Sequence, residues 1–124
     1  MRRHMADPAL RLRQICLLAR DLEWTSSVLS AAFDAPVVFR DPRMAAEGTL
    51  TNTHIRLGDS FLETVSPTDL AWERSTTQTR LLARHGDCGY MAIVQVPDIG
   101  KASRSMATQG EGRGIVAGNW NVCA

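Results

Sequence analysis

The feature that most constrains the fold of this chain is a short pattern that occurs twice. The segments QICLLARDL, from Gln14, and MAIVQVPDI, from Met91, align without a gap, and each reaches an aspartate, Asp21 or Asp98. In both places the aspartate precedes an amphipathic segment that it can cap as a helix. A repeated strand, aspartate and helix in one small chain predicts two similar modules that share a core, rather than a doubly wound sheet.

Size and charge exclude several classes of protein. With 124 residues, the chain has room for one soluble domain but not for two. Its 14 basic and 13 acidic side chains form no basic stripe, which argues against a nucleic-acid partner. No apolar stretch approaches the ~20 residues that span a bilayer, and the first residues lack the apolar core of a secretion signal. We therefore expect a cytoplasmic protein that does not enter membranes. Three cysteines without a CxxC pair predict neither a disulfide framework nor a zinc knuckle.

The first half of the domain predicts a strand, a helix and a short edge strand. The strand covers about residues 13–20, with Gln14 and Cys16 on one face and Ile15 on the other. The helix covers 22–33, and a short strand at 37–40 lies between two prolines, as an edge strand can. A loop is expected around residues 44–48. The apolar stripe expected to face the sheet consists of Leu22, Val28, Leu29, Ala32 and Phe33, with Ser26, Ser27 and Ser30 toward solvent.

The segment TLTNTHIRL, followed by Gly58-Asp59 and SFLETVSP, predicts a β-hairpin with a two-residue turn. Counting outward from the turn places Leu57 opposite Ser60, and His54 opposite Glu63. One face of the hairpin then carries Asn52, His54, Arg56, Phe61, Glu63 and Val65.

The second half predicts fewer elements. A connector helix in RSTTQTRLLARHG ends at Gly86 as its C-terminal cap, and the strand GYMAIVQV follows it. Met91 and Ile93 share one face of this strand. Asp98 caps a helix to about Thr108, and a last apolar piece occurs around residues 115–116.

Four segments in combination resemble the glyoxalase, bleomycin-resistance and extradiol-dioxygenase superfamily, which is also called the vicinal oxygen chelate superfamily. These segments are RQICLLARDL, LGDSFLETVSP, TRLLARHGDCGYM and GYMAIVQVPDI. The resemblance implies an α+β fold: a βαβββ module and a partial second βαβ module that form a cupped mixed sheet, with helices on its outer face. Residues 1–10 would be a flexible tail. Residues 11–124 would form the domain, with a first module at 11–67, a connector at 68–88 and a truncated second module at 89–124.

In that family each module contributes metal ligands, usually a histidine or glutamine from its first strand and a glutamate from its last. By the resemblance, Gln14 matches the first-strand ligand and Glu63 the last-strand ligand of the first module. Met91 stands at the first-strand ligand position of the second module. A thioether is a poor ligand for hard divalent ions. The fourth ligand strand is missing, because too few residues follow GIVAG to complete it. We therefore expect divalent metal binding to be weak or absent.

Two readings of Glu63 stay open. It is either a catalytic or ligating carboxylate with its pKa raised by burial, or one half of a structural ion pair with His54 or Arg56 across the hairpin. His54 is either a proton shuttle or replacement ligand, or a cross-strand partner. The other candidate substrate-binding residues are Gln14, Cys16, Met91 and Ile93, which could line an apolar cavity or form an inert core.

The resemblance therefore suggests a protein descended from metal-dependent lyases, isomerases or dioxygenases, with a degenerate metal site. The alternatives are a non-enzymatic module that binds or sequesters a small molecule, and an inactive piece of a longer two-module protein. The partners expected are a small-molecule ligand and a second copy of the chain. The dimer is expected because the strand from Gly89 is apolar on both faces and would lack neighbours in its own module.

Overall fold

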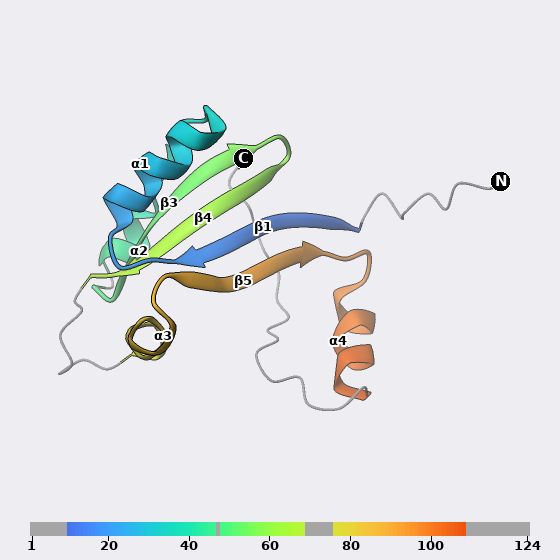
Figure 1. Ribbon diagram of the computed structural model, residues 1–124. Helices are drawn as coiled ribbons and strands as arrows, with labels where there is room; N and C mark the ends of the chain where they lie inside the picture. Colours follow the sequence, from blue (N-terminus) through green and yellow to red (C-terminus); the bar gives the residue numbers. More distant parts are fainter. Residues whose placement is uncertain (1–9, 47, 69–75, 109–124) are drawn as a thin grey trace. The chain divides into compact units, whose positions relative to one another are not determined.

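The structure, a computed structural model, describes residues 10–46, 48–68 and 76–108. Its elements, in chain order, are β1 (Arg11–Leu18), α1 (Leu22–Phe33), β2 (Val37–Phe39), α2 (Pro42–Ala46), β3 (Leu50–Leu57), β4 (Ser60–Pro67), α3 (Thr77–His85), β5 (Cys88–Gln95) and α4 (Ile99–Thr108). The predicted α+β class is confirmed (Figure 1). Residues 1–9 of the predicted tail, the apolar piece around residues 115–116 and Cys123 lie outside the described residues.

One mixed sheet runs through the structure, in the strand order β2-β3-β4-β1-β5. β1 pairs with β4 in parallel, whereas β3 is antiparallel to both β2 and β4. The hairpin register is the predicted one: His54 lies opposite Glu63, and Leu57 opposite Ser60. Gly58 has a φ of 61°, the left-handed conformation that a two-residue turn of this kind requires.

The two faces of the sheet carry different groups. We call one the Glu63 face and the other the Thr53 face. By register and alternation, the Glu63 face carries Gln14, Cys16 and Leu18 of β1, Asn52, His54 and Arg56 of β3, and Phe61, Glu63 and Val65 of β4. The Thr53 face carries the intervening side chains.

Helix α1 packs on the Thr53 face through a serine, which corrects the predicted apolar stripe. Ser26 is the buried residue of α1, and its hydroxyl lies 2.6 Å from that of Thr53. Val28 and Phe33, predicted to face the sheet, are 45% and 52% exposed. The small hydroxyl pair lets the helix approach the strand closely, and this rotates the larger side chains outward.

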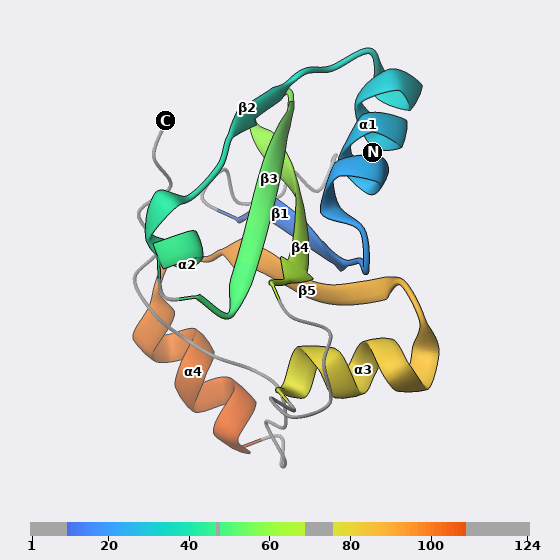
Figure 2. The same cartoon turned by 90° about the vertical axis from the view of Figure 1, so that its left-hand side faces the viewer.

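Helix α3 closes one end of the Glu63 face. Its Leu82 packs in a buried cluster with Leu18 and Val65, and Tyr90 of β5 packs against that cluster. Gln78 of α3 donates a hydrogen bond of 2.8 Å to the Tyr90 hydroxyl. Figure 2 shows α3 running beside β5.

The helix ends follow the sequence signals, with one exception. The Asp21 carboxylate accepts from the Trp24 N–H, as predicted for an N-cap, and the Gly86 N–H donates to the Leu82 carbonyl. The loop expected around residues 44–48 is wrong for residues 44–46, which belong to α2. Pro42 is the first residue of α2, where a missing N–H costs nothing, and the Asp41 carboxylate accepts from the Arg43 N–H. β1 begins and ends two residues earlier than predicted.

The chain divides into two compact units, Leu12–Ile93 and a second that comprises Met1–Arg11 and Val94–Ala124. In the second unit, α4 begins with the predicted cap: the Asp98 carboxylate accepts from the Lys101 N–H at 2.9 Å. No helix in the described ranges is long and apolar enough to cross a membrane. The proposed division into modules and connector stays a prediction.

Candidate functional site

The candidate site is organised around the carboxylate of Glu63, in the middle of β4. Glu63 is only 5% exposed. Its Oε2 accepts two hydrogen bonds of 2.9 Å, from Asn52 Nδ2 and from His54 Nε2, both on β3. Its Oε1 accepts from Cys16 Sγ, on β1, at 3.2 Å. Neighbouring strands on both sides of β4 therefore supply donors to one buried carboxylate.

The donor chain continues along β1. Gln14 Nε2 donates to Cys16 Sγ at 3.2 Å, and both residues are almost completely buried. Burial raises the pKa of the Cys16 thiol to about 12, with a further contribution from the charge of Glu63. A thiol with so high a pKa stays protonated and donates to Glu63, so Cys16 is not a nucleophile in this state.

The environment of Glu63 lowers its pKa. Burial, the largest single influence, opposes ionisation, but the hydrogen bonds from His54, Asn52 and Cys16 together outweigh it. Of the two readings of Glu63, the raised pKa of the catalytic or ligating one is not found, whereas the cross-hairpin pair with His54 is present. The partner across the hairpin is His54, and Arg56 instead lies over the ring of Phe61, with 5.2 Å between its guanidinium carbon and the ring centre. Glu63 is thus an ionised, well-satisfied carboxylate at neutral pH.

Two phenylalanines enclose the imidazole of His54. Its ring centre lies 5.5 Å from that of Phe39, on β2, and 6.0 Å from that of Phe61, which meets it edge-on. The side chain is 11% exposed. Nε2 faces Glu63, whereas Nδ1 is buried and has no hydrogen-bond partner. His54 therefore contacts both the Glu63 carboxylate and the two phenylalanine rings.

The two candidate residues from β5 do not enter this network. Met91 is 45% exposed and Ile93 is partly buried. Tyr90 and Cys88 pack against the cluster on the Glu63 face, so alternation directs Met91 to the other face of β5. The structure thus brings together four of the six predicted residues: Gln14, Cys16, His54 and Glu63.

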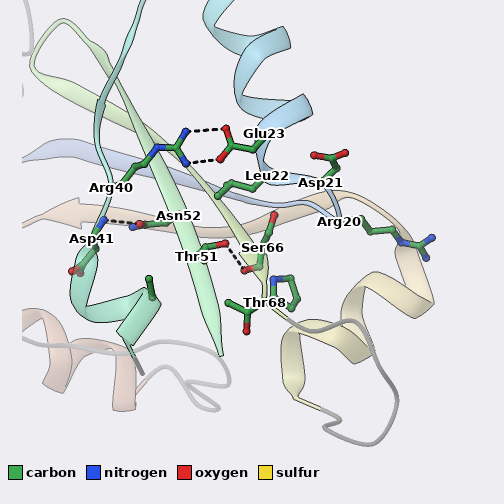
Figure 3. A pocket seen from close by; sticks show the side chains of 12 residues that line it. Arg20, Asp21, Leu22, Glu23, Arg40, Asp41, Thr51, Asn52, Ser66 and Thr68 are labelled. Carbon is green, nitrogen blue, oxygen red and sulfur yellow. Dashed lines mark hydrogen bonds and ion pairs between the residues drawn. The ribbon is translucent and has the colours of Figure 1, made fainter. Parts of the chain in front are cut away.

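A cleft of about 700 Å³ lies next to this network, between the N-terminal end of α1, α2 and β3. Its walls include Glu23 and Arg40, which form a two-pronged ion pair at 2.6 and 2.9 Å, together with Thr51, Asn52 and Ser66 (Figure 3). None of the six predicted site residues lines the cleft. The volume lies within the range of small-molecule pockets.

Asn52 is the site residue that sequence reasoning missed. It lines the cleft, accepts the Asp41 N–H on its Oδ1 at 2.9 Å, and donates from its Nδ2 to Glu63. Strand alternation already placed Asn52 on the face of Glu63. What the sequence did not reveal is the bend after Phe39, which brings Asp41 next to Asn52 on β3. Hydrophobic periodicity does not predict such a bend.

The donor set does not fit a resident divalent metal ion. Across the described ranges, no three histidine, cysteine, aspartate or glutamate side chains are grouped to hold one. The carboxylate of Glu63 already holds three protein donors, and the amide nitrogen of Gln14 is engaged with Cys16. A metal at Gln14 and Glu63 would have to displace the donors to Glu63. Weak or absent metal binding remains a prediction.

No protein-family model and no curated protein matches this sequence. Solved structures do match. Methylmalonyl-CoA epimerase from Mycobacterium tuberculosis has a TM-score of 0.66 and 14% identity over 86% of this chain and 69% of that chain. A hypothetical protein from Bacillus halodurans C-125 has a TM-score of 0.67 and 13% identity, over 82% of this chain and 70% of that chain.

A third match is a methylmalonyl-CoA epimerase in complex with methylmalonyl-CoA and NH4+, with a TM-score of 0.66 and 16% identity, over 82% of this chain and 70% of that chain. At such identities the likeness shows the fold alone. The chain therefore has the fold seen in these epimerase structures, and the α+β fold that the sequence resemblance implied is confirmed.

Proposed function

We propose that this chain, which has a glyoxalase-like fold, binds a small molecule without converting it. The observation that carries the proposal is the state of Glu63: buried, ionised and held by three protein donors. A general base works best with a pKa near the operating pH, whereas the pKa of Glu63 is shifted downward. Such a carboxylate is suited to organising a binding surface rather than to taking a proton.

The cleft beside Asn52 is the ligand site of this proposal. The hydroxyls of Thr51 and Ser66 donate to backbone carbonyls, which leaves their oxygens as acceptors, and Glu23 and Arg40 place one negative and one positive charge at the cleft. Charges of opposite sign at the rim favour a small polar molecule without a strong net charge. Glu63 and the Asp41 N–H hold the two ends of the Asn52 amide, so Asn52 lines the cleft in one fixed orientation.

A binding screen tests this proposal. We expect small polar compounds to raise the melting temperature of the protein, and Arg40→Gln to abolish the shift without lowering the basal melting temperature by more than a few degrees. Arg40 and Glu23 are exposed, so their ion pair adds little stability. Arg84→Gln, on the exposed side of α3, is the matched control and should behave as wild type. Equal shifts in both variants would contradict a site in the cleft.

A second candidate is an isomerase or lyase, favoured by the fold shared with methylmalonyl-CoA epimerases. In that case the ionised Glu63 would take a proton from a carbon beside a carbonyl group. Methylmalonyl-CoA in deuterated buffer is the direct probe. The binding proposal expects no exchange of the C2 proton above the buffer rate, whereas exchange that Glu63→Gln removes would establish the enzyme instead.

The proposed role of Glu63 also has a stability consequence. Glu63→Ala would leave three buried donors, Cys16 Sγ, Asn52 Nδ2 and His54 Nε2, without their acceptor. A buried hydrogen-bond donor that is left without an acceptor costs about 1–3 kcal/mol. Urea unfolding measures this loss, and a loss below about 1 kcal/mol would mean that water replaces the carboxylate and that the site is open.

We also propose that two copies associate through β5. Among the described strands, β5 lies at an edge of the sheet, opposite β2. It has eight residues, CGYMAIVQ, without a charge or a proline that would discourage pairing. β2, by contrast, has three residues and an irregular register. We therefore expect the β5 strands of two copies of the chain to pair with each other, because β5 is the longer of the two described edge strands.

A further inference from the structure

Among the described residues, three hydroxyl side chains line the cleft, and each of them uses its hydrogen within the protein. Thr51 donates to the Ser66 carbonyl at 3.3 Å. Ser66 donates to the Ala19 carbonyl at 2.6 Å. Thr68 donates to the Gly48 carbonyl. A hydroxyl group has one hydrogen and two lone pairs, so these oxygens can only accept further hydrogen bonds. A ligand that lies against them must therefore supply donors.

The buried part of this polar lining is held in place before any ligand arrives. Ser66 is 2% exposed, and its hydrogen bond to Ala19 sets the direction of its lone pairs. Asn52, which also lines the cleft, is 3% exposed and has its amide bound to the Asp41 N–H and to Glu63. Side chains that are already ordered lose little conformational entropy on binding. The lining is therefore pre-organised to receive a donor.

Carboxylates outnumber guanidinium groups around the cleft. The charged residues of its lining are Asp21, Glu23, Asp41, Arg20 and Arg40. Arg20 donates to the Leu82 carbonyl in the last turn of α3, and Figure 3 shows its side chain directed away from the Glu23–Arg40 pair. The surplus of negative charge favours a donor group that is itself positive, such as an ammonium group.

Arg40 can bind a group of the opposite charge. A guanidinium has five N–H donors, and Glu23 accepts from one donor on each terminal nitrogen of Arg40. The other N–H groups of Arg40 have no acceptor within the described ranges, so a ligand carboxylate can bind them while the ion pair stays intact. Leu22, Ala45 and Pro67 also line the cleft and offer apolar contacts to carbon atoms between two charged groups.

We propose that the cleft binds a small amino acid in its zwitterionic form. Its ammonium group lies at the hydroxyl oxygens of Thr51, Ser66 and Thr68, and its carboxylate lies at Arg40. This inference rests on the proposed small-molecule function and names the class of its ligand. A zwitterion has no net charge, as the opposite charges of Glu23 and Arg40 favour, and the cleft of about 700 Å³ has room for it.

The test uses three zwitterions, glycine, γ-aminobutyrate and ε-aminocaproate, which hold the two charges at different separations. Each is compared with the carboxylate and the amine of the same chain length. Titrations of the full chain are followed by ¹H–¹⁵N spectra of the Asn52 side-chain amide, which lines the cleft. We expect at least one zwitterion to bind about tenfold more tightly than either analogue, because each analogue lacks one charge-assisted hydrogen bond. Equal affinities within all three sets would overturn the proposal.

Two variants assign the ends of the ligand. Arg40→Gln should remove the advantage of the zwitterion over the amine. Thr51→Val, which replaces the acceptor oxygen with a methyl group of similar size, should reduce its advantage over the carboxylate. Thr77→Val, at an exposed position of α3, is the matched control and should bind like wild type. Unchanged preferences in both cleft variants would contradict the proposed orientation.

An uncharged compound of the same length, butyramide, separates this inference from the proposed function. If butyramide shifts the Asn52 resonances while no zwitterion binds more tightly than its analogues, the small-molecule function survives and the zwitterion class is wrong. If none of these compounds shifts the Asn52 resonances or raises the melting temperature, the cleft is not a ligand site and both proposals fail.

Discussion

The strands β1 and β5 come from the same repeated pattern but end in opposite surroundings. On β1, Gln14, Cys16 and Leu18 are 1% exposed or less. On β5, Met91 is 45% and Val94 is 49% exposed. β1 lies between β4 and β5, whereas β5 has one described neighbour. The repeated pattern therefore specifies a strand followed by a capped helix. The neighbouring strands in the sheet determine whether the side chains of that strand are buried.

The difference shows where a site can form in such a chain. A buried polar network needs strands on both sides, because donors must reach one carboxylate from several directions. β4 receives them from β1 and β3, and so Glu63 is satisfied. β5 has no such pair of described neighbours, and its first-strand position holds a thioether, Met91, instead of a ligand.

The two cysteines of these strands provide the sharpest test. With its pKa raised to about 12 from an ordinary 9.0, Cys16 should react with iodoacetamide about a thousandfold more slowly than an ordinary thiol at pH 8. Cys88, partly buried on β5, should be alkylated first. Peptide mass spectrometry after timed labelling of the native protein measures both. Equal labelling would mean that β1 opens as easily as β5.

Truncation of one apolar side chain on each strand compares their packing. Leu18→Ala should lower the free energy of unfolding by about 3 kcal/mol, because Leu18 is fully enclosed with Val65 and Leu82. Met91→Ala should cost less than about 0.5 kcal/mol, as at other exposed positions. Urea denaturation gives both values, and a large loss at Met91 would show that β5 is covered in solution.

Acid should weaken the network that joins β4 to β1 and β3 through Glu63. The folded protein holds the pKa of Glu63 below its ordinary 4.5, so the unfolded chain binds the proton first as the pH falls. The stability that Glu63 contributes is fully present above about pH 5 and is lost as the pH falls through the folded-state pKa. Glu63→Gln should flatten this dependence strongly. Glu23→Gln should flatten it less, because Arg40 also lowers the pKa of Glu23 but solvent screens this exposed ion pair.

The smallest effect concerns association. Sedimentation equilibrium at micromolar concentration should show a species of twice 13.6 kDa. Val94→Lys should weaken the dimer by about tenfold, since a charge on an edge strand discourages pairing. A 13.6 kDa monomer with a cooperative thermal transition would contradict the dimer and would leave the β5 edge as a solvated strand.

Local signals predicted much of this fold. The Gly58-Asp59 turn determined the hairpin register, and that register brought His54 to Glu63. The bounds of α1 follow from its cap at Asp21 and a left-handed residue at Asp34. These features depend on neighbours within a few residues, so their chemistry can be read along the chain.

Tertiary choices were less predictable. Periodicity could not reveal that Ser26 faces Thr53, because the hydroxyl pair overrides the preference for larger apolar contacts. The lowered pKa of Glu63 depends on Cys16, which is 47 residues away in sequence. Burial alone argues for a raised pKa, and only the placement of the donors reverses its direction.

The side chain of Asn52 has its polarity specified at both ends, with Oδ1 held by the Asp41 N–H and Nδ2 held by Glu63. An aspartate at this position could not donate to Glu63, and a leucine could neither donate to Glu63 nor accept from the Asp41 N–H. Few residue types can therefore replace Asn52. The amide proton of Asp41 then becomes a remote reporter. Its hydrogen-exchange rate should rise when Glu63 is neutralised, which would let a backbone amide at the start of α2 register the charge of a buried carboxylate on β4.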